Sequence, residues 1–369
     1  MGLFLYRFLC CAALVLFAGP ALAEHASFTE SQGPPSFDSD YLVTDDVPQA
    51  QTLTVTIAGD CTLGGTETAG KKADSFLKTV DKNGLNYPFS GLLPLFSRDD
   101  LTLVNLEGVF SDSSRGENTQ KEFAFRGPAK YAQILPLGSV EAVNLSNNHF
   151  DDYGKTGRDA TLAALEKYGV AYAGNEWLCV YNTGRGKIGL AGMKGSLTEE
   201  KKEAVKRQIA LFKDADCQII IYSLHAGQEY AAKHNGLQRD MARYLIDAGA
   251  DVVAGHHPHV VQGVEIYKDR YIFYSLGNCV FGGNHDPRES DALAAQITFT
   301  LEDGRLKSLQ AALHPLSFTG GKKGNTFRPV SLTGKQADAV LKKIQQDTAF
   351  PLPAFEEGHG ALLSPIPVQ

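Results

Sequence analysis

Short apolar runs alternate with amphipathic segments along most of this chain, and the alternation predicts a mixed α/β fold. In the first half, apolar runs at 53–58, 101–106, 140–145 and 170–173 predict β-strands. Apolar residues recur at helical spacing over 159–168, with Gly169 placed to end a helix there. This half of the chain is therefore expected to form βαβ units.

The second half adds hairpins to this pattern. Turn residues at 182–184, 268–270 and 303–304 separate pairs of strand-like runs. Amphipathic helices are expected over 197–212, 237–248 and 335–345; the first two precede strands at 217–224 and from Asp251 onward. This mixture of parallel and antiparallel strands predicts two mixed sheets packed together, with helices outside them.

The two ends of the chain differ from this middle part. Residues 1–23 carry a single charge, Arg7, then an apolar run and the small residues Ala21 and Ala23. This is typical of a cleaved signal peptide or, if it is retained, of a membrane anchor. Residues 24–50 are acidic and aperiodic, as expected of a flexible linker. We expect one domain over 51–320, followed by a C-terminal helix and a Pro-rich tail over 321–369.

Composition narrows the classes of partner. The formal net charge is −7 and no basic block interrupts the chain, so nucleic acid is excluded as an expected partner. Four cysteines follow the leader, namely Cys61, Cys179, Cys217 and Cys279. In an exported protein they could pair in three ways, and the sequence does not choose among them.

Ligand-capable side chains follow the predicted strands. The run 250–259 is a small and β-branched strand that ends in a glycine and three histidines. Sites in α/β sheets lie beyond the carboxyl ends of strands, and imidazole and carboxylate groups bind Mn, Fe or Zn. Any one of these residues alone also fits a turn cap or a satisfied core histidine, but five such strand ends favour a site for one or two divalent metal ions. The candidate ligands are Asp60, Glu107, Asn148, His225, His256, His257 and His259.

A general acid is predicted beside this site. His149 is followed three residues later by Asp152, whose carboxylate can stabilise an imidazolium. Asn105, Asn147 and Asn278 also lie at or near strand ends, and we expect them to surround the ligands or the substrate.

With these residues assembled, the chain resembles the poly-gamma-glutamate capsule biosynthesis (CapA-type) family. The matching segments are, in order, IAGDCTLGG, VNLEGVF, LSNNHFDDYGKTG, SLHAGQEY, GADVVAGHHPHVVQGVEIY and FYSLGNCVFG. The pattern NNHxxDxGxxG followed by GHHPH is highly specific. The resemblance implies the calcineurin-like, metallo-dependent phosphatase fold, a four-layer α/β/β/α sandwich of two mixed sheets with a metal centre at the top of the sheets.

The resemblance also implies a division of the ligands. Asp60 and His259 would hold one metal ion, Asn148 and His225 the other, and Glu107 would lie near the bridging position. Two ions held this way would clamp a bridging hydroxide that attacks an ester or related bond.

Other roles implied by the resemblance lie around these ligands. Either His256 or His257 would complete the second ion's ligands, and His149 would be the proton donor to the leaving group. The chain departs from ordinary metallophosphoesterases at Thr62, where a histidine is common, and at Glu107, where an aspartate is common. Ala226 stands where family members often carry a tryptophan, so the substrate could differ from the family's usual polymer.

Two functions are therefore expected. The first is an exported metal-dependent hydrolase of capsule, poly-gamma-glutamate or related envelope polymer biosynthesis, acting on an anionic polymer or a phosphorylated envelope substrate. The alternative is a non-catalytic accessory protein that binds the polymer on the same scaffold. Membrane-bound components of a polymer synthase are further expected partners. The expected location is periplasmic or extracellular, with a membrane anchor if the leader is retained.

Overall fold

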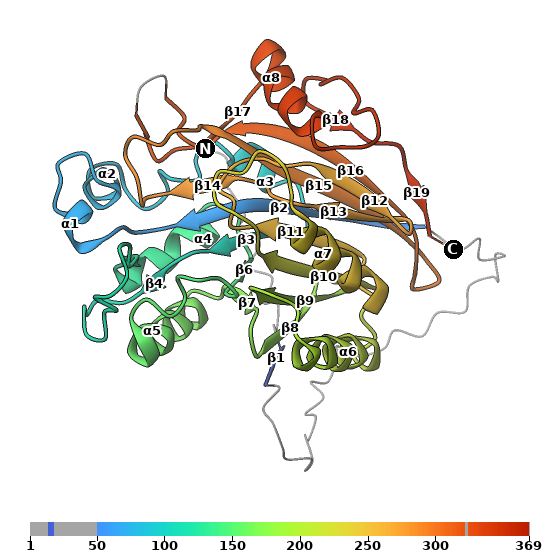
Figure 1. The fold of residues 1–369 in the computed structure, drawn as a ribbon, viewed down its shortest axis with the longest axis horizontal. Helices are drawn as coiled ribbons and strands as arrows, with labels where there is room; N and C mark the ends of the chain where they lie inside the picture. The colour runs from blue at the N-terminus through green and yellow to red at the C-terminus, as the bar shows by residue number, and fades with distance from the viewer. Residues whose placement is uncertain (1–13, 18–49, 322–323, 369) are drawn as a thin grey trace, which may run out of the picture.

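The computed structural model describes residues 14–17, 50–321 and 324–368, which form two mixed β-sheets packed together with helices outside (Figure 1). The mixed α/β class predicted from the apolar pattern is confirmed. The predicted leader and linker lie outside the described residues, apart from Leu14–Phe17 and Ala50. Within the described ranges, no helix is long and apolar enough to cross a membrane.

The larger sheet is parallel on one side, from β2 (Gln51–Thr62) to its edge strand β7 (Ala171–Ala173), and antiparallel on the other. Its other strands are β3 (Leu101–Leu106), β6 (Ala142–Asn144), β14 (Asn278–Phe281), β15 (Asp291–Glu302), β16 (Arg305–Ser317), β17 (Val330–Ser331), β18 (Ala361–Leu362) and β19 (Ile366–Pro367). The main order is β17-β16-β15-β2-β3-β6-β7, while β14 pairs with β2, and β18 and β19 pair with β16. β2, β3, β6 and β7 are parallel, as the βαβ pattern predicts, and β15 and β16 form the hairpin predicted at 303–304.

The smaller sheet contains the other two predicted hairpins. Its strands are β1 (Leu14–Phe17), β8 (Trp177–Asn182), β9 (Lys187–Lys194), β10 (Ile219–His225), β11 (Val252–His256), β12 (Val264–Tyr267) and β13 (Arg270–Phe273), in the order β1-β8-β9-β10-β11-β13-β12. β8 with β9, and β12 with β13, are antiparallel pairs, whereas β9, β10, β11 and β13 are parallel. A separate ribbon pairs β4 (Val109–Phe110) with β5 (Arg126–Gly127).

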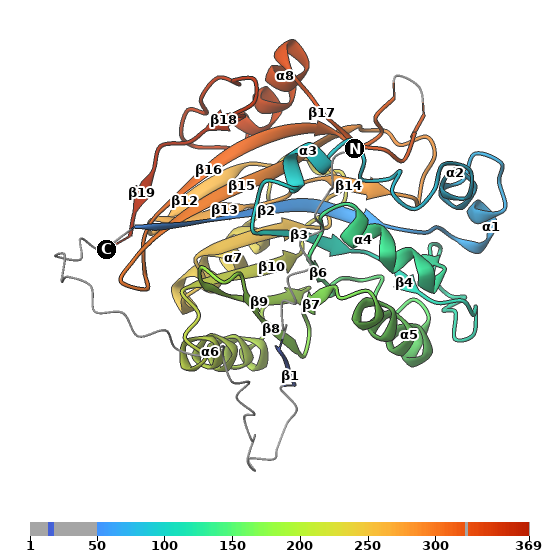
Figure 2. The ribbon, with the colours of Figure 1, turned by 180° about the vertical axis from the view of Figure 1, so that it is seen from behind.

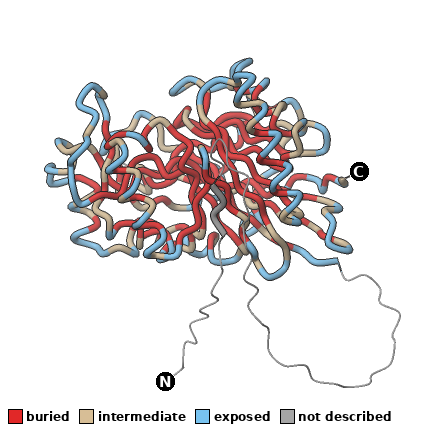
Figure 3. The backbone as a smooth tube through the Cα atoms, turned by 90° about the horizontal axis from the view of Figure 1, so that it is seen from below, coloured by how far each residue is buried: buried red, intermediate tan, exposed pale blue. Residues whose placement is uncertain are grey.

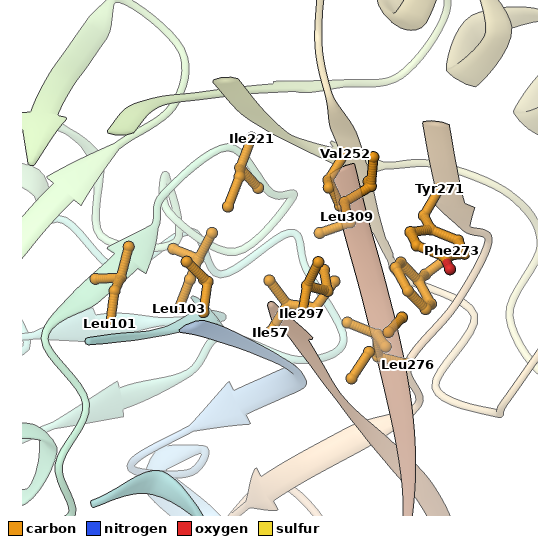
Figure 4. Packing of buried hydrophobic residues seen from close by; sticks show 14 of the residues in the cluster. Ile57, Leu101, Leu103, Ile221, Val252, Tyr271, Phe273, Leu276, Ile297 and Leu309 are labelled. Carbon is orange, nitrogen blue, oxygen red and sulfur yellow. The ribbon is translucent and has the colours of Figure 1, made fainter. Parts of the chain in front are cut away.

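The main hydrophobic core lies between the two sheets. Ile57, Leu101 and Leu103 of the larger sheet face Ile221 and Val252 of the smaller one (Figure 4). All residues of β3 are buried, because its two faces contact different layers, and this explains its unbroken apolar sequence. Each large side chain buried here contributes about 1.5–3 kcal/mol.

Helices cover the outer faces of the sheets. α6 (Glu199–Asp214) and α7 (Gly236–Ala248) pack on the smaller sheet, where Phe212 and Leu245 join Tyr222 in a second apolar cluster. On the larger sheet, α2 (Phe76–Asn83), α3 (Leu93–Phe96), η1 (Ala129–Gln133), α4 (Ile134–Leu137) and α5 (Gly154–Lys167) share a third cluster. Figure 2 shows α3 and α4 in front of this face. The short helix α1 (Glu67–Gly70) follows β2.

The C-terminal segment packs on the same core. α8 (Gly334–Gln345) contributes Val340 and Ile344 to the cluster between the sheets, and Leu363 and Ile366 join them. The buried residues therefore form a continuous band through the molecule (Figure 3).

Candidate metal centre

The polar residues predicted at the strand ends lie together at one end of the sheets. In Figure 1 this is the left-hand end, where β2 finishes and α1 begins. All the candidate ligands are buried except Asn148 and His257, which are partly exposed. The side chains that the sequence analysis expected to converge therefore lie close together.

An irregularity in β2 brings Asp60 into this centre. The register of β2 against β3 shifts between Ile57 and Asp60, and the Asp60 N–H donates to Gly277 O at 3.0 Å. A Cβ atom at Gly59 would lie 2.0 Å from Gly277 O, so this close approach requires glycine. β2 continues to Thr62, so Asp60 lies inside the strand rather than at its end as the sequence suggested.

Asp60, Glu107 and His259 form one group whose ligand atoms lie within 4.8 Å of one another. His259 Nδ1 is 3.3 Å from Asp60 Oδ2 and 3.9 Å from Glu107 Oε2. This group contains the pair that the resemblance assigned to one metal ion.

Glu107, His225 and His257 form a second group of the same kind. His225 Nε2 lies 3.7 Å from Glu107 Oε1 and 2.7 Å from Asn148 Oδ1, so the Asn148 amide oxygen faces the same point. Glu107 belongs to both groups and turns one oxygen toward each. This is the arrangement expected of a residue near a bridging position.

The neighbouring residues His256 and His257 have different surroundings. His257 belongs to the second group, and its ring centroid lies 4.7 Å from that of His225. His256 is buried beside Asp60, with Nδ1 at 3.4 Å from Asp60 Oδ1. The geometry therefore favours His257 as the further ligand of the second group, a choice that spacing alone left open.

The histidine loop adopts a backbone conformation that is unusual for these residues. His257 has φ 99° and His259 has φ 58°, both in the region that favours glycine. Such conformations cost about 1–3 kcal/mol each and persist at sites where surrounding contacts enforce them. Here the His257 N–H donates to Asp60 Oδ2 at 3.2 Å, which ties the loop to the centre.

Burial and neighbouring charges shift the pKa values of the titratable groups in the centre. Burial would raise the pKa of Asp60, but hydrogen bonds and charge from His256 and His259 lower this pKa well below its ordinary value. Burial raises the pKa of Glu107 to about 8, although the charge of His259 opposes the shift. Burial also lowers the pKa of His225 well below its usual range, which keeps the imidazole in its neutral, ligating form.

The residues present fit a divalent cation. Both carboxylate oxygens of Glu107 are buried without a hydrogen-bond partner among the described residues, as is His257 Nδ1. A buried carboxylate without a partner costs several kcal/mol, and a cation between the two groups would supply the missing interaction. Imidazole nitrogens with carboxylate and amide oxygens suit Mn, Fe or Zn.

Asparagines connect the ligands behind the centre. Asn105 Nδ2 donates to Asp60 Oδ1 at 2.8 Å, and Asn147 Nδ2 donates to Asn105 Oδ1 at 3.2 Å. Asn278 Oδ1 lies 2.9 Å from His259 Nδ1. Asn105 and Asn278 therefore contact candidate ligands directly and can orient them, and Asn147 supports Asn105. Asn144, which donates to Asn105 Oδ1 at 2.8 Å, was missed; its signal was an amide inside an apolar strand.

His149 and Asp152 form the predicted pair. His149 Nδ1 lies 2.7 Å from Asp152 Oδ2, and its Nε2 faces the centre at 4.0 Å from Glu107 Oε1. Asp152 also pairs with Lys121, whose ammonium lies 2.6 Å from Oδ1. Phe125 packs against the His149 ring with centroids 4.5 Å apart.

Two lysines support the loop that carries His149, and sequence reasoning missed both. Lys121 Nζ donates to the Asn148 carbonyl, and Lys194 Nζ donates to the Asn147 carbonyl at 2.7 Å. Neither lysine has a local sequence signal, because each lies far along the chain from the loop it holds.

Comparison with known proteins identifies the family of this chain. The family model described as "Bacterial capsule synthesis protein PGA_cap" matches residues 54–177 and 179–283, which include every candidate ligand. The chain belongs to this family. The matched residues include strands of both sheets and end just after β14, so β15 to β19 of the larger sheet lie outside the match.

Relatives of this family extend the match along the chain. A capsule biosynthesis protein, CapA, of Bacillus anthracis is 26% identical over 323 residues, covering 80% of this chain and 74% of the relative. The PGA biosynthesis protein CapA of Bacillus subtilis is 25% identical over 295 residues, covering 74% of this chain and 75% of the relative. A probable polyglutamine synthesis accessory protein of Mycobacterium tuberculosis is 26% identical over 254 residues, covering 57% and 64%.

Proposed function

We propose that this member of the capsule synthesis family is a metal-dependent hydrolase that acts on poly-gamma-glutamate or a related anionic envelope polymer. The observation that carries the proposal is Glu107, whose two buried oxygens have no hydrogen-bond partner in the described part of the chain and each face a different group of candidate ligands. The names of the relatives, which include capsule and PGA biosynthesis, support the substrate class.

Each group would hold one divalent ion, of Mn, Fe or Zn. Asp60 and His259 would hold the first, His225, His257 and Asn148 the second, and Glu107 would contact both. Bound ions would activate water and polarise the bond to be cleaved.

The chain's own acid would complete the reaction. His149 holds Asp152 through Nδ1, which leaves Nε2 free to give a proton to the leaving group on the side facing the centre. Asp152 stabilises the protonated imidazole and fixes its orientation, as in other histidine–carboxylate pairs.

The wider expectations belong to the same proposal. The packing of two sheets between outer helices supports a four-layer metallo-dependent phosphatase-like sandwich. The apolar leader supports export to the periplasm or cell exterior, where membrane-bound polymer synthase components would be partners.

A second candidate is a non-catalytic protein that binds the polymer during its assembly or export. The accessory role in the name of the Mycobacterium tuberculosis relative favours it. In this case metal ions would supply the positive charge that a polyanion needs in a chain of net charge −7.

Elemental analysis and a hydrolysis assay test the two candidates together. Residues 24–369, purified without chelator, are expected to carry near-stoichiometric Mn, Fe or Zn that is absent from the Asp60→Ala/His259→Ala double variant. The metal-loaded protein is expected to cleave poly-gamma-glutamate or a phosphoester. His149→Ala should slow this turnover by about 10²- to 10⁴-fold and leave the metal content unchanged.

Each alternative result is informative. Turnover that survives His149→Ala would rule out this residue as the acid. Polymer affinity that survives His149→Ala but falls with a chelator, without any cleavage, would establish the binding role. A folded protein that takes up no metal would overturn the metal centre itself.

A further inference from the structure

A cleft of about 830 Å³ opens onto the candidate metal centre. Asn148, His149, His225 and His257 line it, so a molecule in the cleft would touch the centre directly. The volume lies in the range of clefts that bind extended ligands, and it exceeds what a single small anion at the centre would need.

Three lysines line the cleft, namely Lys121, Lys194 and Lys201. Their positive charges are neutralised to different degrees. Lys121 is paired with the buried carboxylate of Asp152 at 2.6 Å. Lys194 lies 3.3 Å from Asp151, whose half-exposed carboxylate is shared with Arg158. Lys201 has no acidic partner among the described residues.

The Lys201 ammonium is held in place by neutral groups, which do not compensate its positive charge. It donates to two neutral main-chain oxygens, Lys194 O at 2.6 Å and Ser196 O at 3.0 Å. An ammonium has three N–H donors, so one remains for a ligand. Because these bonds fix the side chain in advance, an anion that binds there avoids much of the usual cost of ordering a lysine.

The other side chains that line the cleft restrict the kind of molecule that can carry the negative group. Phe123 and Leu237 line the same cleft and are 50% and 47% exposed, which is unusual for large apolar side chains. Glu122 and Glu229 also line it and would repel an anion from their side. The ligand therefore needs apolar stretches as well as a negative group placed toward Lys194 and Lys201.

We propose that Lys194 and Lys201 form a carboxylate-binding subsite for an acidic, peptide-like polymer whose neighbouring unit lies at the metal centre. This proposal rests on the proposed function, which supplies the polymer. Methylene groups of the polymer would contact Phe123 and Leu237, and one of its carboxylates would accept the free N–H of Lys201. The subsite sets specificity, because a ligand without a carboxylate at this place leaves the Lys201 charge unpaired.

Fluorescence anisotropy with a labelled oligo-γ-glutamate tests the subsite in metal-loaded protein at low and high salt. Lys201→Gln is expected to weaken binding about tenfold at low salt and to reduce its salt dependence. Lys201→Arg should retain most of the affinity. Lys206→Gln is the matched control, since Lys206 lies on the same helix, pairs with Glu203 and is outside the cleft.

Two results would overturn the subsite while leaving the proposed function intact. One is wild-type affinity in Lys201→Gln; the other is an equal loss of affinity at every salt concentration, which would indicate a structural effect on the 194–196 loop. Competition by inorganic phosphate that disappears in Lys201→Gln would reassign the subsite to a phosphoryl group. Failure of the wild-type protein to bind or cleave the oligomer would instead overturn the proposed function for this polymer.

Discussion

A single carboxylate, Glu107, links the two halves of the candidate centre. Its oxygens face His225 on one side and His259 on the other, at 3.7 and 3.9 Å. Burial raises its pKa to about 8, so without a cation the side chain is largely protonated near neutral pH. A cation would have to displace this proton, and metal binding should therefore strengthen as the pH rises.

Glu107→Gln tests this residue. The amide keeps the shape of the side chain and removes its charge, so we expect the affinity for Mn²⁺ to fall by at least about 100-fold. The metal-free variant should be as stable as metal-free wild type or more so, because a buried acid without partners is replaced by a neutral group. Isothermal titration with Mn²⁺ and urea unfolding measure the two quantities. Unchanged Mn²⁺ affinity would remove Glu107 from the centre.

A partly buried acid, Asp99, is expected to make stability depend on pH; it precedes β3, whereas Glu107 of the candidate centre follows that strand. Burial raises the pKa of Asp99 to about 7, although Thr56 and Thr102 oppose the shift through hydrogen bonds. Between about pH 4 and 7 the folded state therefore holds a proton that the unfolded state has released. The contribution of Asp99 to stability is present below this window and is lost as the pH rises through it.

Asp99→Asn is expected to remove this loss. The free energy of unfolding of the variant, relative to wild type, should rise across the window by up to about 1.4 kcal/mol per pH unit. Urea unfolding at several pH values measures the difference. Asp303→Asn, at an exposed hairpin turn, controls for the lost charge, and a flat difference in Asp99→Asn would contradict the shift.

At the scale of elements, the main strands and the amphipathic helices were predictable, and the short helices were not. The continuous apolar run at 101–106 is β3, and the Asp303–Gly304 turn joins β15 to β16, because each pattern has only one good solution. The short helices α3 and α4 are made mainly of apolar residues and show no helical period, so tertiary packing decides them.

In the candidate site, too, features with a local sequence signal were predictable, and features that depend on tertiary structure were not. The grouping of the candidate ligands could be predicted because buried strands that end in histidine or carboxylate are unusual. The choice of His257 over His256 could not, since it depends on a left-handed backbone at His257. Lys121 and Lys194 were missed because their contacts join segments that are distant in sequence.

The helix α7 lies in the chain between β10, which ends at His225, and β11, which ends at His256, and its first turn is capped. Asn235 Oδ1 accepts from the Gln238 N–H at 2.9 Å, and the Asn235 N–H donates to Gln238 Oε1 at 3.1 Å. This reciprocal pair is a capping box.

Asn235→Ala is therefore expected to lower the free energy of unfolding by about 1 kcal/mol. Asn235→Ser, which keeps an acceptor oxygen, should change it by much less. Urea unfolding of the two variants compares these values. Equal losses in both would show that the cap does not stabilise the helix.

At the scale of the whole molecule, the candidate centre is shared by the two sheets. Asp60, Glu107 and Asn148 come from the larger sheet or the loops that follow its strands, and His225 and His257 come from the smaller one. The positions of these groups therefore depend on the core between the sheets. Anything that loosens this core should weaken metal binding without touching a ligand.

The C-terminal segment provides such a test. Val340 and Ile344 belong to the core between the sheets, and Asp347 Oδ2 accepts the N–H groups of His234 and Gly263, each at 2.9 Å. These bonds tie the end of α8 to the loop that follows His225. We expect residues 24–320 alone to lose cooperative unfolding and stoichiometric metal, because deletion exposes apolar core and leaves buried N–H groups without partners.

Asp347→Ala separates the anchor from the core contribution, since it removes both acceptor oxygens and keeps every apolar contact of the segment. It is expected to lower the free energy of unfolding by about 1–3 kcal/mol while unfolding stays cooperative. Urea unfolding followed by circular dichroism, with elemental analysis of each protein, distinguishes the effects. If residues 24–320 unfolded as cooperatively as 24–369 and kept their metal, the segment would be a separable tail and the centre would depend on the two sheets alone.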